Sequence, residues 1–236
     1  MRSTRFASPA LGAALLLSGL AAAPARAADA QHPTVIELFQ SQGCSSCPPA
    51  NASLIRFSQR PDVLALNFAV TYWDRLGWKD TFASPQFTQR QYDYANALHG
   101  SGVYTPQIVV NGRLDGVGDE VSEMVALAGK TDRGATGPSV AIEGGEVAIG
   151  AGSAPARGAD VWLALYDPRT VEVAIARGEN AGRTLAHKNI VRQMLLLGHW
   201  TGGAARVPLP AADGGLARAV LVQSAGTGPI LAAVKG

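Results

Sequence analysis

Two apolar runs with a pair of cysteines between them constrain the fold of this chain more than any other feature. Residues 35–39 and 63–70 have the length and apolar character of buried strands. Between them lie the sequence Cys44-Ser-Ser-Cys47 and a predicted helix over residues 50–59. A helix of this length can connect two parallel neighbouring strands. The sequence therefore predicts a strand–helix–strand unit with the cysteines at its first junction.

The segment that follows extends this unit. The pattern predicts a helix over residues 84–98, a strand over 107–110 and a further helix over 119–130. Asn111-Gly112 is a strong two-residue hairpin turn, so a short return strand should follow it. The order strand–helix–strand–helix–hairpin–helix is that of thioredoxin-like α/β domains. An element order of this kind predicts a fold and carries no function by itself.

Short β runs replace the helices after Gly137-Pro138. They are separated by Gly, Pro and Asp, and they cover residues 140–142, 147–149, 161–166, 171–175 and 219–222. Regular short runs at this spacing predict a small β-rich, sandwich-like domain. We place the boundary between Thr131 and Pro138. The expected domains are thus residues 28–136, thioredoxin-like, and 137–236, β-rich.

The first 27 residues have the pattern of a secretory signal peptide. Arg2 and Arg5 precede an apolar stretch, residues 11–20, that is too short to span a bilayer. Ala25-Arg26-Ala27 offers small residues where a signal peptidase cuts. Cleavage there predicts a periplasmic or secreted chain without an integral membrane segment, in a compartment where disulfides persist. The alternative is an uncleaved membrane anchor.

The charge of the chain argues against a nucleic-acid-binding protein. The sequence holds 20 Lys and Arg residues against 18 Asp and Glu residues. Three of the arginines and none of the acids lie in the first 27 residues, so the remaining chain is close to neutral. A near-neutral chain without a basic stripe lacks the electrostatic footprint that nucleic acid requires. Two cysteines are also too few for a disulfide-dense scaffold or a four-thiolate zinc site.

Cys44 and Cys47 carry the candidate chemistry. Two cysteines three residues apart can close a small disulfide ring, and a helix N-terminus stabilises a thiolate. Cys44 would then be the nucleophile and Cys47 the thiol that resolves the mixed disulfide. Two other interpretations stay open. The pair can form a permanent structural disulfide, or it can bind copper or another soft metal, with His99 as a third ligand.

Two further positions belong to the predicted catalytic set. Thr105-Pro106 opens the third strand, where a thioredoxin-like fold places a cis proline that faces the disulfide. Proline has no N–H, so it can face a sulfur without offering a donor; the alternative is an ordinary trans proline. Glu37 lies in an apolar strand, seven residues before Cys44. A carboxylate buried beneath the disulfide can take the proton from Cys47, whereas the alternative is a carboxylate that faces solvent.

An aromatic segment follows the second predicted strand. Tyr72, Trp73 and Trp78 can form a wall beside the dithiol, and together with Thr105 they make up the predicted substrate-binding set. Aromatic-rich walls suit a peptide or protein partner. The alternative is that these rings pack the second domain against the first.

Several motifs of the chain resemble those of a family of exported bacterial proteins, which is catalogued as a domain of unknown function with a thioredoxin-like fold. The similar motifs are Glu37–Ala50, Tyr72–Asp74, Leu76–Asp80, Tyr104–Gln107, Val110–Gly112, Gly178–Arg183 and Gly228–Leu231. The resemblance implies a thioredoxin-like first domain with Cys44, Cys47 and Pro106 at the redox centre. It supplies no substrate.

The sequence as a whole favours a periplasmic thiol–disulfide oxidoreductase that acts through Cys44 and Cys47. Its expected partner is a protein that bears a disulfide or a thiol, and the reaction needs neither a dissociable cofactor nor a metal. The alternatives are a copper chaperone and a non-catalytic binding module with a structural disulfide. Nothing in the sequence indicates the oligomeric state.

Overall fold

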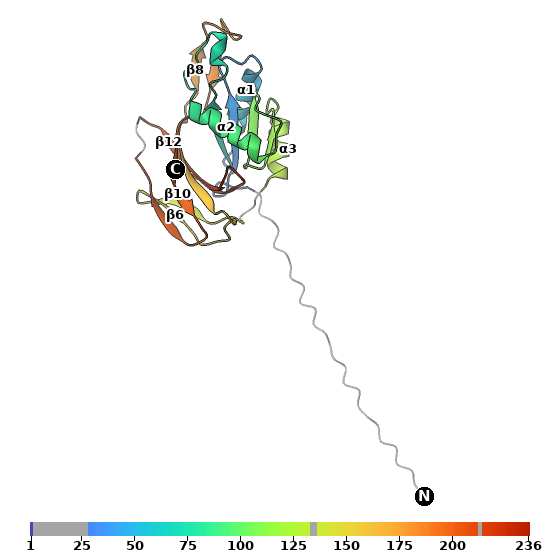
Figure 1. The fold of residues 1–236 in the computed structure, drawn as a ribbon, viewed down its shortest axis with the longest axis vertical. Coiled ribbons are helices and arrows are strands. Elements are labelled where there is room, and N and C mark those ends of the chain that lie inside the picture. Colours follow the sequence, from blue (N-terminus) through green and yellow to red (C-terminus); the bar gives the residue numbers. More distant parts are fainter. Residues whose placement is uncertain (2–27, 133–135, 212–213) are drawn as a thin grey trace.

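The computed structural model describes Met1 and residues 28–132, 136–211 and 214–236. Apart from Met1, the predicted signal peptide lies outside the described residues. Among the helices described, none is long and apolar enough to cross a membrane. Figure 1 shows an α/β body at one end and a β-rich region at the other.

The first half contains both strands and helices, whereas the elements described in the second half are all strands. The helices are α1 (Cys47–Phe57), the 3-10 turn η1 (Asp74–Leu76), α2 (Pro85–Ala97) and α3 (Val121–Lys130). The strands of the first half are β1 (Thr34–Gln40), β2 (Val63–Ala69), β3 (Gln107–Val110) and β4 (Leu114–Gly116). Those of the second half are β5 (Val140–Glu143), β6 (Glu146–Ile149), β7 (Ala159–Asp167), β8 (Val171–Ala174), β9 (Thr184–His187), β10 (Ile190–Trp200), β11 (Ala205–Pro208), β12 (Ala217–Ser224) and β13 (Ile230–Lys235). The predicted element order of the first half is confirmed.

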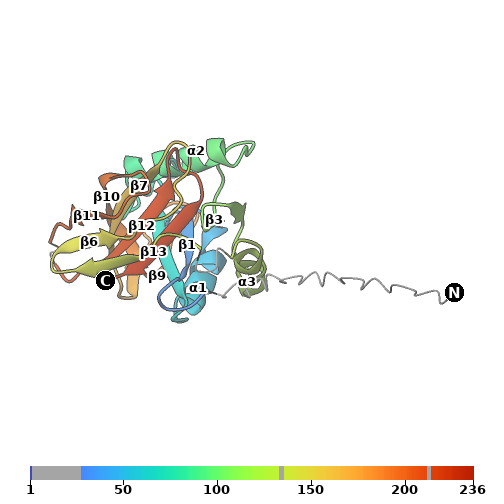
Figure 2. The same ribbon diagram turned by 90° about the horizontal axis from the view of Figure 1, so that it is seen from below.

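The first half is a mixed sheet covered by helices on both faces. β1 pairs with β2 in parallel and with β3 antiparallel, and β4 extends the sheet beyond β3. Figure 2 shows α2 on one face of this sheet and α1 with α3 on the other. The α1 crossover between parallel β1 and β2 is the unit predicted from the apolar runs.

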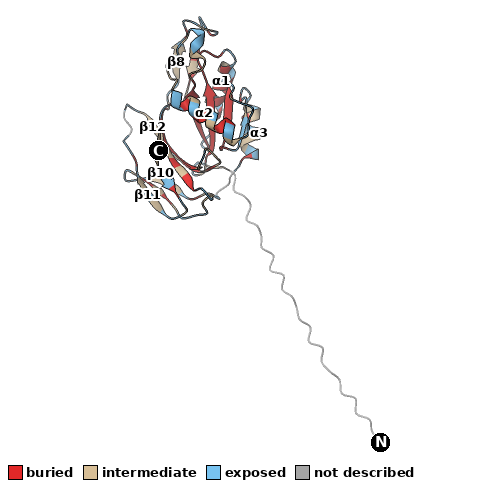
Figure 3. Ribbon diagram, in the orientation of Figure 1, coloured by how far each residue is buried: buried red, intermediate tan, exposed pale blue. Residues whose placement is uncertain are grey.

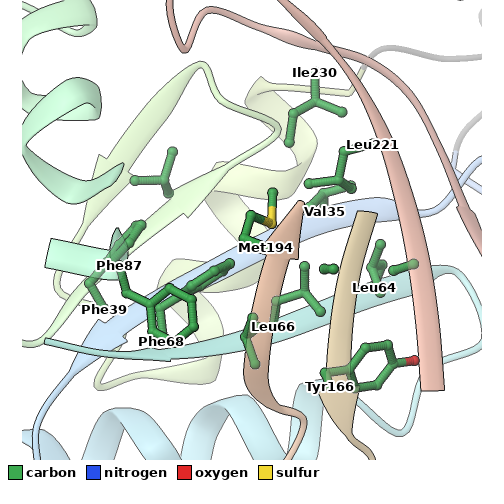
Figure 4. Packing of buried hydrophobic residues seen from close by; sticks show 14 of the residues in the cluster. Val35, Phe39, Leu64, Leu66, Phe68, Phe87, Tyr166, Met194, Leu221 and Ile230 are labelled. Atoms are coloured by element: carbon green, nitrogen blue, oxygen red, sulfur yellow. The ribbon is translucent and has the colours of Figure 1, made fainter. Parts of the chain in front are cut away.

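Strand β1 is buried on both faces because helices cover both faces. Ile36 and Leu38 pack with α1 and α3 against Leu54 and Met124. Their alternate neighbours, including Phe39, pack on the α2 face in the cluster drawn in Figure 4. Alternation along a strand puts successive side chains on opposite faces, so a strand buried on both sides is a continuous apolar run. Figure 3 shows these central strands as buried.

The β-rich half continues the same sheet. Ile190 of β10 pairs with Asn67 of β2, and the eight strands lie in the order β13-β12-β7-β10-β2-β1-β3-β4. A second sheet, β11-β6-β5, packs its Val147 against Val161 and Val220 of the large sheet, which gives the predicted sandwich-like layering. The mixed α/β class with a β-rich region is thus confirmed, and a division into two domains after residue 136 stays a prediction.

The predicted hairpin turn joins the two halves of the chain. Asn111 and Gly112 have left-handed φ angles of 51° and 63°, as expected, but three residues, 111–113, separate β3 from β4 instead of the predicted two. A Cβ on Gly112 would lie 2.6 Å from the carbonyl oxygen of Gly228, so only glycine fits. The Ile230 N–H also donates to the Asn111 carbonyl at 2.9 Å.

Candidate functional site

Cys44 and Cys47 form a disulfide at the carboxyl end of β1. Their Cα atoms are 5.5 Å apart, and Cys47 is the first residue of α1. The helix begins three residues earlier than predicted because Pro48 and Pro49 occupy its first turn, where a missing N–H costs no intrahelical bond. Cys44 therefore lies just outside the helix.

Both sulfurs are screened from solvent. The exposed fractions of Cys44 and Cys47 are 0% and 1%, although Ser45 and Ser46 between them are exposed. Cys47 nevertheless borders a cleft of about 210 Å³ between α1 and β9. Reaction at either sulfur therefore requires some movement of the residues around it.

The predicted cis proline lies next to the cysteine motif. The Thr105–Pro106 peptide bond is cis, as expected. The Ser46 hydroxyl donates to the Thr105 carbonyl at 3.4 Å, and it lies 3.3 Å from Cys44 Sγ. The loop before β3 and the cysteine motif therefore meet at Ser46.

The predicted aromatic residues contact the loops that flank the disulfide. Trp73 Nε1 donates to Thr105 Oγ1 at 2.7 Å, directly before the cis bond. Trp78 Nε1 donates to Gln42 Oε1 at 2.9 Å, two residues before Cys44. Tyr72 is directed toward α2, where its hydroxyl donates to Gln91 Oε1 at 3.2 Å. Trp73 and Trp78 thus connect the aromatic segment to the loop before β3 and to the loop before Cys44. The binding of substrate by the predicted set stays a prediction.

Glu37 is buried as predicted, but the structure does not place it beneath the disulfide. Its carboxylate accepts from Arg90 Nε at 2.7 Å and Nη2 at 3.1 Å, and from the Tyr94 hydroxyl. Desolvation alone would lower the pKa of Arg90, but the Glu37 carboxylate outweighs it and holds that pKa above its usual value. The reason is strand alternation: Glu37 faces α2, whereas α1 with Cys47 covers the opposite face.

Neutral amides occupy the space behind Cys47 instead. Asn51 Nδ2 donates to Gln40 Oε1 at 3.1 Å and to the Cys47 carbonyl at 3.4 Å. Asn67 Nδ2 donates to Asn51 Oδ1 at 2.8 Å, and all three amides are buried. This chain of amides was not predicted from the sequence, although Gln40 and Asn67 are polar residues at the end of, or within, apolar strands.

A buried carboxylate does hold the loop before Cys44. Asp80 Oδ2 accepts from the Gln42 N–H at 2.7 Å, and Oδ1 accepts from the Phe82 N–H at 2.8 Å. Burial raises the pKa of Asp80 above its usual value. The aromatic segment thus contributes an anchor of the cysteine loop as well as its rings.

The loop between β8 and β9 contacts the backbone around Cys44. Asn180 is fully buried, and its Nδ2 donates to the carbonyls of Gln42 and Cys44, at 2.9 Å each. Glu179 Oε2 accepts from the Ser45 N–H at 3.1 Å. Residues 178–183 carried part of the family resemblance, but no role for them followed from the sequence.

The structure does not bring His99 to the cysteines. Its neighbour Leu98 borders a cleft with Gly112 and Pro229, at the opposite end of β3 from the cis proline. No group of three or more His, Cys, Asp and Glu side chains suited to a metal ion is found in the part of the chain that the structure describes. The structure therefore does not support His99 as a third metal ligand, and metal binding by the two cysteines stays a prediction.

Two solved structures resemble this one. A crystal structure of a protein from Agrobacterium tumefaciens has a TM-score of 0.74 and 34% sequence identity, and the match covers 89% of this chain and 95% of that chain. HBP35 of Porphyromonas gingivalis has a TM-score of 0.58 over 87% of this chain and 75% of its own. Its sequence identity is 12%, so that likeness concerns the fold alone. Among curated proteins, none matches the chain.

One family model matches most of the chain. It is described as a protein of unknown function, DUF1223, and it matches residues 35–223. The match runs from β1 to β12 and includes both cysteines, the cis proline and the loop over Cys44. The expectation of a family of unknown function is confirmed, whereas export and thioredoxin-like character stay predictions. The chain belongs to the DUF1223 family.

Proposed function

We propose that this protein is a thiol–disulfide oxidoreductase of an exported, oxidising compartment, with a thioredoxin-like first half. One observation carries the proposal: a disulfide at the start of a helix lies against a loop that holds a cis proline. A disulfide in this position can be attacked by a thiolate, because the N-terminus of α1 stabilises the sulfur that leaves as an anion. Cys47, at that N-terminus, is the leaving sulfur.

The exchange balances without a cofactor. A thiolate of the partner protein attacks Cys44 Sγ, the Cys44–Cys47 bond breaks, and Cys47 leaves as a thiolate that takes a proton from water. A second thiolate of the partner then attacks the mixed disulfide and releases Cys44. The partner loses two electrons and gains a disulfide, and the reverse sequence reduces a partner instead. Because the groups behind Cys47 are neutral amides, no buried carboxylate takes part in this scheme.

The partner would lie over Ser45, Ser46 and the Thr105–Pro106 loop. Ser45 and Ser46 are exposed, and Trp73 supports Thr105 from the side. The half-buried rings of Trp73 and Trp78 supply apolar surface of the kind that peptide segments bind. A protein with an accessible thiol or disulfide in an extended segment is thus the expected substrate class.

Trapping of a mixed disulfide tests this function. The Cys47→Ala variant should form an adduct with insulin, used as a disulfide-bearing probe, because Cys44 attacks and no second thiol resolves the product. The Cys44→Ser variant is the matched control and should form none. Adducts would be measured by mass spectrometry without reductant, and the wild-type protein should accelerate insulin reduction by dithiothreitol. The proposal fails if the two variants behave alike and the wild-type protein has no effect.

A structural disulfide is the second candidate, and one observation favours it. Both sulfurs are nearly fully buried, as is usual for bonds that resist reduction. The two candidates differ in the reduction potential that each predicts for the bond.

A further inference from the structure

We propose that the loop between β8 and β9, residues 175–183, is a gate that must open before the disulfide can react with any thiol. The motivating observation is a contrast in exposure. Cys44 is 0% exposed, although Ser45 and Ser46, which follow it, are exposed. The cysteine loop therefore reaches the surface although the Cys44 sulfur is enclosed, and residues 175–183 contact the backbone on both sides of Cys44.

Asn180 is the centre of this gate. Its side-chain amide donates both hydrogens to backbone carbonyls of the cysteine loop, those of Gln42 and Cys44, at 2.9 Å each. Its Oδ1 accepts from Arg183 Nη1 at 2.8 Å, so the amide is fixed in one orientation. Buried hydrogen bonds of this kind each favour the closed position, and losing a partner leaves the other group unsatisfied.

Glu179 also bonds to the cysteine loop in the closed position. Its carboxylate accepts from the Ser45 N–H at 3.1 Å, and hydrogen bonding to Ser45 lowers the pKa of Glu179. Glu179 therefore adds a third hydrogen bond between the gate and the cysteine loop.

The ribbon that carries the gate packs on α1 and does not join the large sheet. β8 and β9 form a two-stranded sheet separate from the eight-stranded one. An isolated two-stranded hairpin is only marginally stable, and its position depends on what it packs against. Gly178 and Gly182 flank the tip with φ angles of 78° and 79°. The tip can thus leave Cys44 without disturbing the large sheet.

Opening would expose Cys44 and free the Ser45 N–H. The gate limits the access of any thiol to Cys44. It is inferred from burial and hydrogen bonding and does not depend on the identity of the partner. That the protein's own partner displaces the loop rests on the proposed function. In that case the partner takes over the surface that Asn180 and Glu179 now cover.

The rate of disulfide reduction by dithiothreitol measures the gate directly. The Asn180→Ala variant loses two bonds to the cysteine loop, so we expect reduction to be about tenfold faster than in the wild-type chain. The equilibrium with a glutathione buffer should stay the same, because the loop covers the site before and after the reaction. Thiols would be counted by alkylation and mass spectrometry.

Asn189→Ala is the matched control. Asn189 also donates its side-chain amide to a backbone carbonyl, that of Ala65 at 2.8 Å, but it lies outside the gate. Its reduction rate should equal that of the wild-type chain. An unchanged rate in Asn180→Ala, or an equal increase in both variants, would overturn the gate.

A milder variant covers the case in which Asn180→Ala does not fold. Arg183 is exposed, and Arg183→Ala removes only its bond to Asn180 Oδ1. Reduction should then be about threefold faster, and no increase would overturn the proposal. Dithiothreitol is not a protein partner, so a gate effect without any insulin adduct would refute the proposed function and leave the gate standing.

Discussion

Buried amides hold both cysteines through their backbone carbonyls. Asn51 contacts the carbonyl of Cys47 from behind, and Asn180 contacts that of Cys44 from the outer side. These contacts fix the loop without a side-chain bond to either sulfur. The hydroxyl of Ser46, at 3.3 Å, is the polar side chain that the structure places on Cys44 Sγ. The two cysteines are therefore held in place through their backbone, and these amides form no bond with the sulfurs.

His187 should make the protein sensitive to acid. It is 0% exposed, and neither ring nitrogen has a hydrogen-bond partner among the residues described. Burial lowers its pKa from 6.5 to about 4, so the unfolded chain takes up a proton first as the pH falls. The stability contributed by the neutral ring is complete above pH 6.5 and is lost progressively between 6.5 and 4. This loss amounts to about 3 kcal/mol in the free energy of unfolding.

Urea unfolding at pH 7.5 and pH 4 tests this. Between these two pH values, the free energy of unfolding of the His187→Leu variant should fall by about 3 kcal/mol less than that of the wild-type chain. His199→Leu is the control, because His199 is half-exposed beside Asp160. An identical pH dependence in all three proteins would contradict the assignment.

At the level of residues, the sequence predicted what local patterns determine. The cysteine spacing and the proline before the third strand were enough to locate the disulfide and the cis bond. The partner of Glu37 was not predictable, because the sequence does not tell which helix covers the face of β1 on which Glu37 lies. Asn180 comes from a segment 136 residues away from Cys44, and no local pattern indicates such a contact.

At the level of elements, helix α2 positions both the buried ion pair and the aromatic segment. It begins at Pro85 after Ser84, whose side chain accepts from the Gln86 N–H at 3.2 Å. Its start was predicted correctly because a Ser-Pro pair is a typical helix start. The pairing of β8 with β9 was not predicted, because β9 is a strand of four residues outside the main sheet.

Removing the cap of α2 should destabilise the protein. Ser84→Ala leaves the Gln86 N–H without its side-chain acceptor, and we expect a loss of about 1 kcal/mol in the free energy of unfolding. Ser84→Asp keeps an acceptor and should cost little. Urea denaturation of the three proteins measures the difference, and an equal loss in both variants would rule out capping as the cause.

At the level of the whole molecule, the two halves share one sheet and one core. The cluster in Figure 4 contains Phe39 and Phe68 from the first half and Met194 and Leu221 from the second. The sequence indicated where the helices end and the β-rich part begins. It could not indicate that β10 would pair with β2, since that pairing joins residues far apart in the chain.

Because the core is shared, we expect the chain to unfold in one transition. The ring of Trp73 lies near the disulfide, whereas Trp200 lies in the second sheet's cluster. Single-tryptophan variants that keep one or the other should give the same urea midpoint by fluorescence. Two separate midpoints would mean that the halves are independent domains.

The central claim is that the Cys44–Cys47 disulfide takes part in exchange with other thiols. Its reduction potential tests this most directly and is measured by equilibrating the folded wild-type protein with glutathione buffers and counting free thiols. An exchanging disulfide should have a potential above about −300 mV, so that protein and small thiols can reduce it. A potential well below about −300 mV would contradict the account and identify a structural bond.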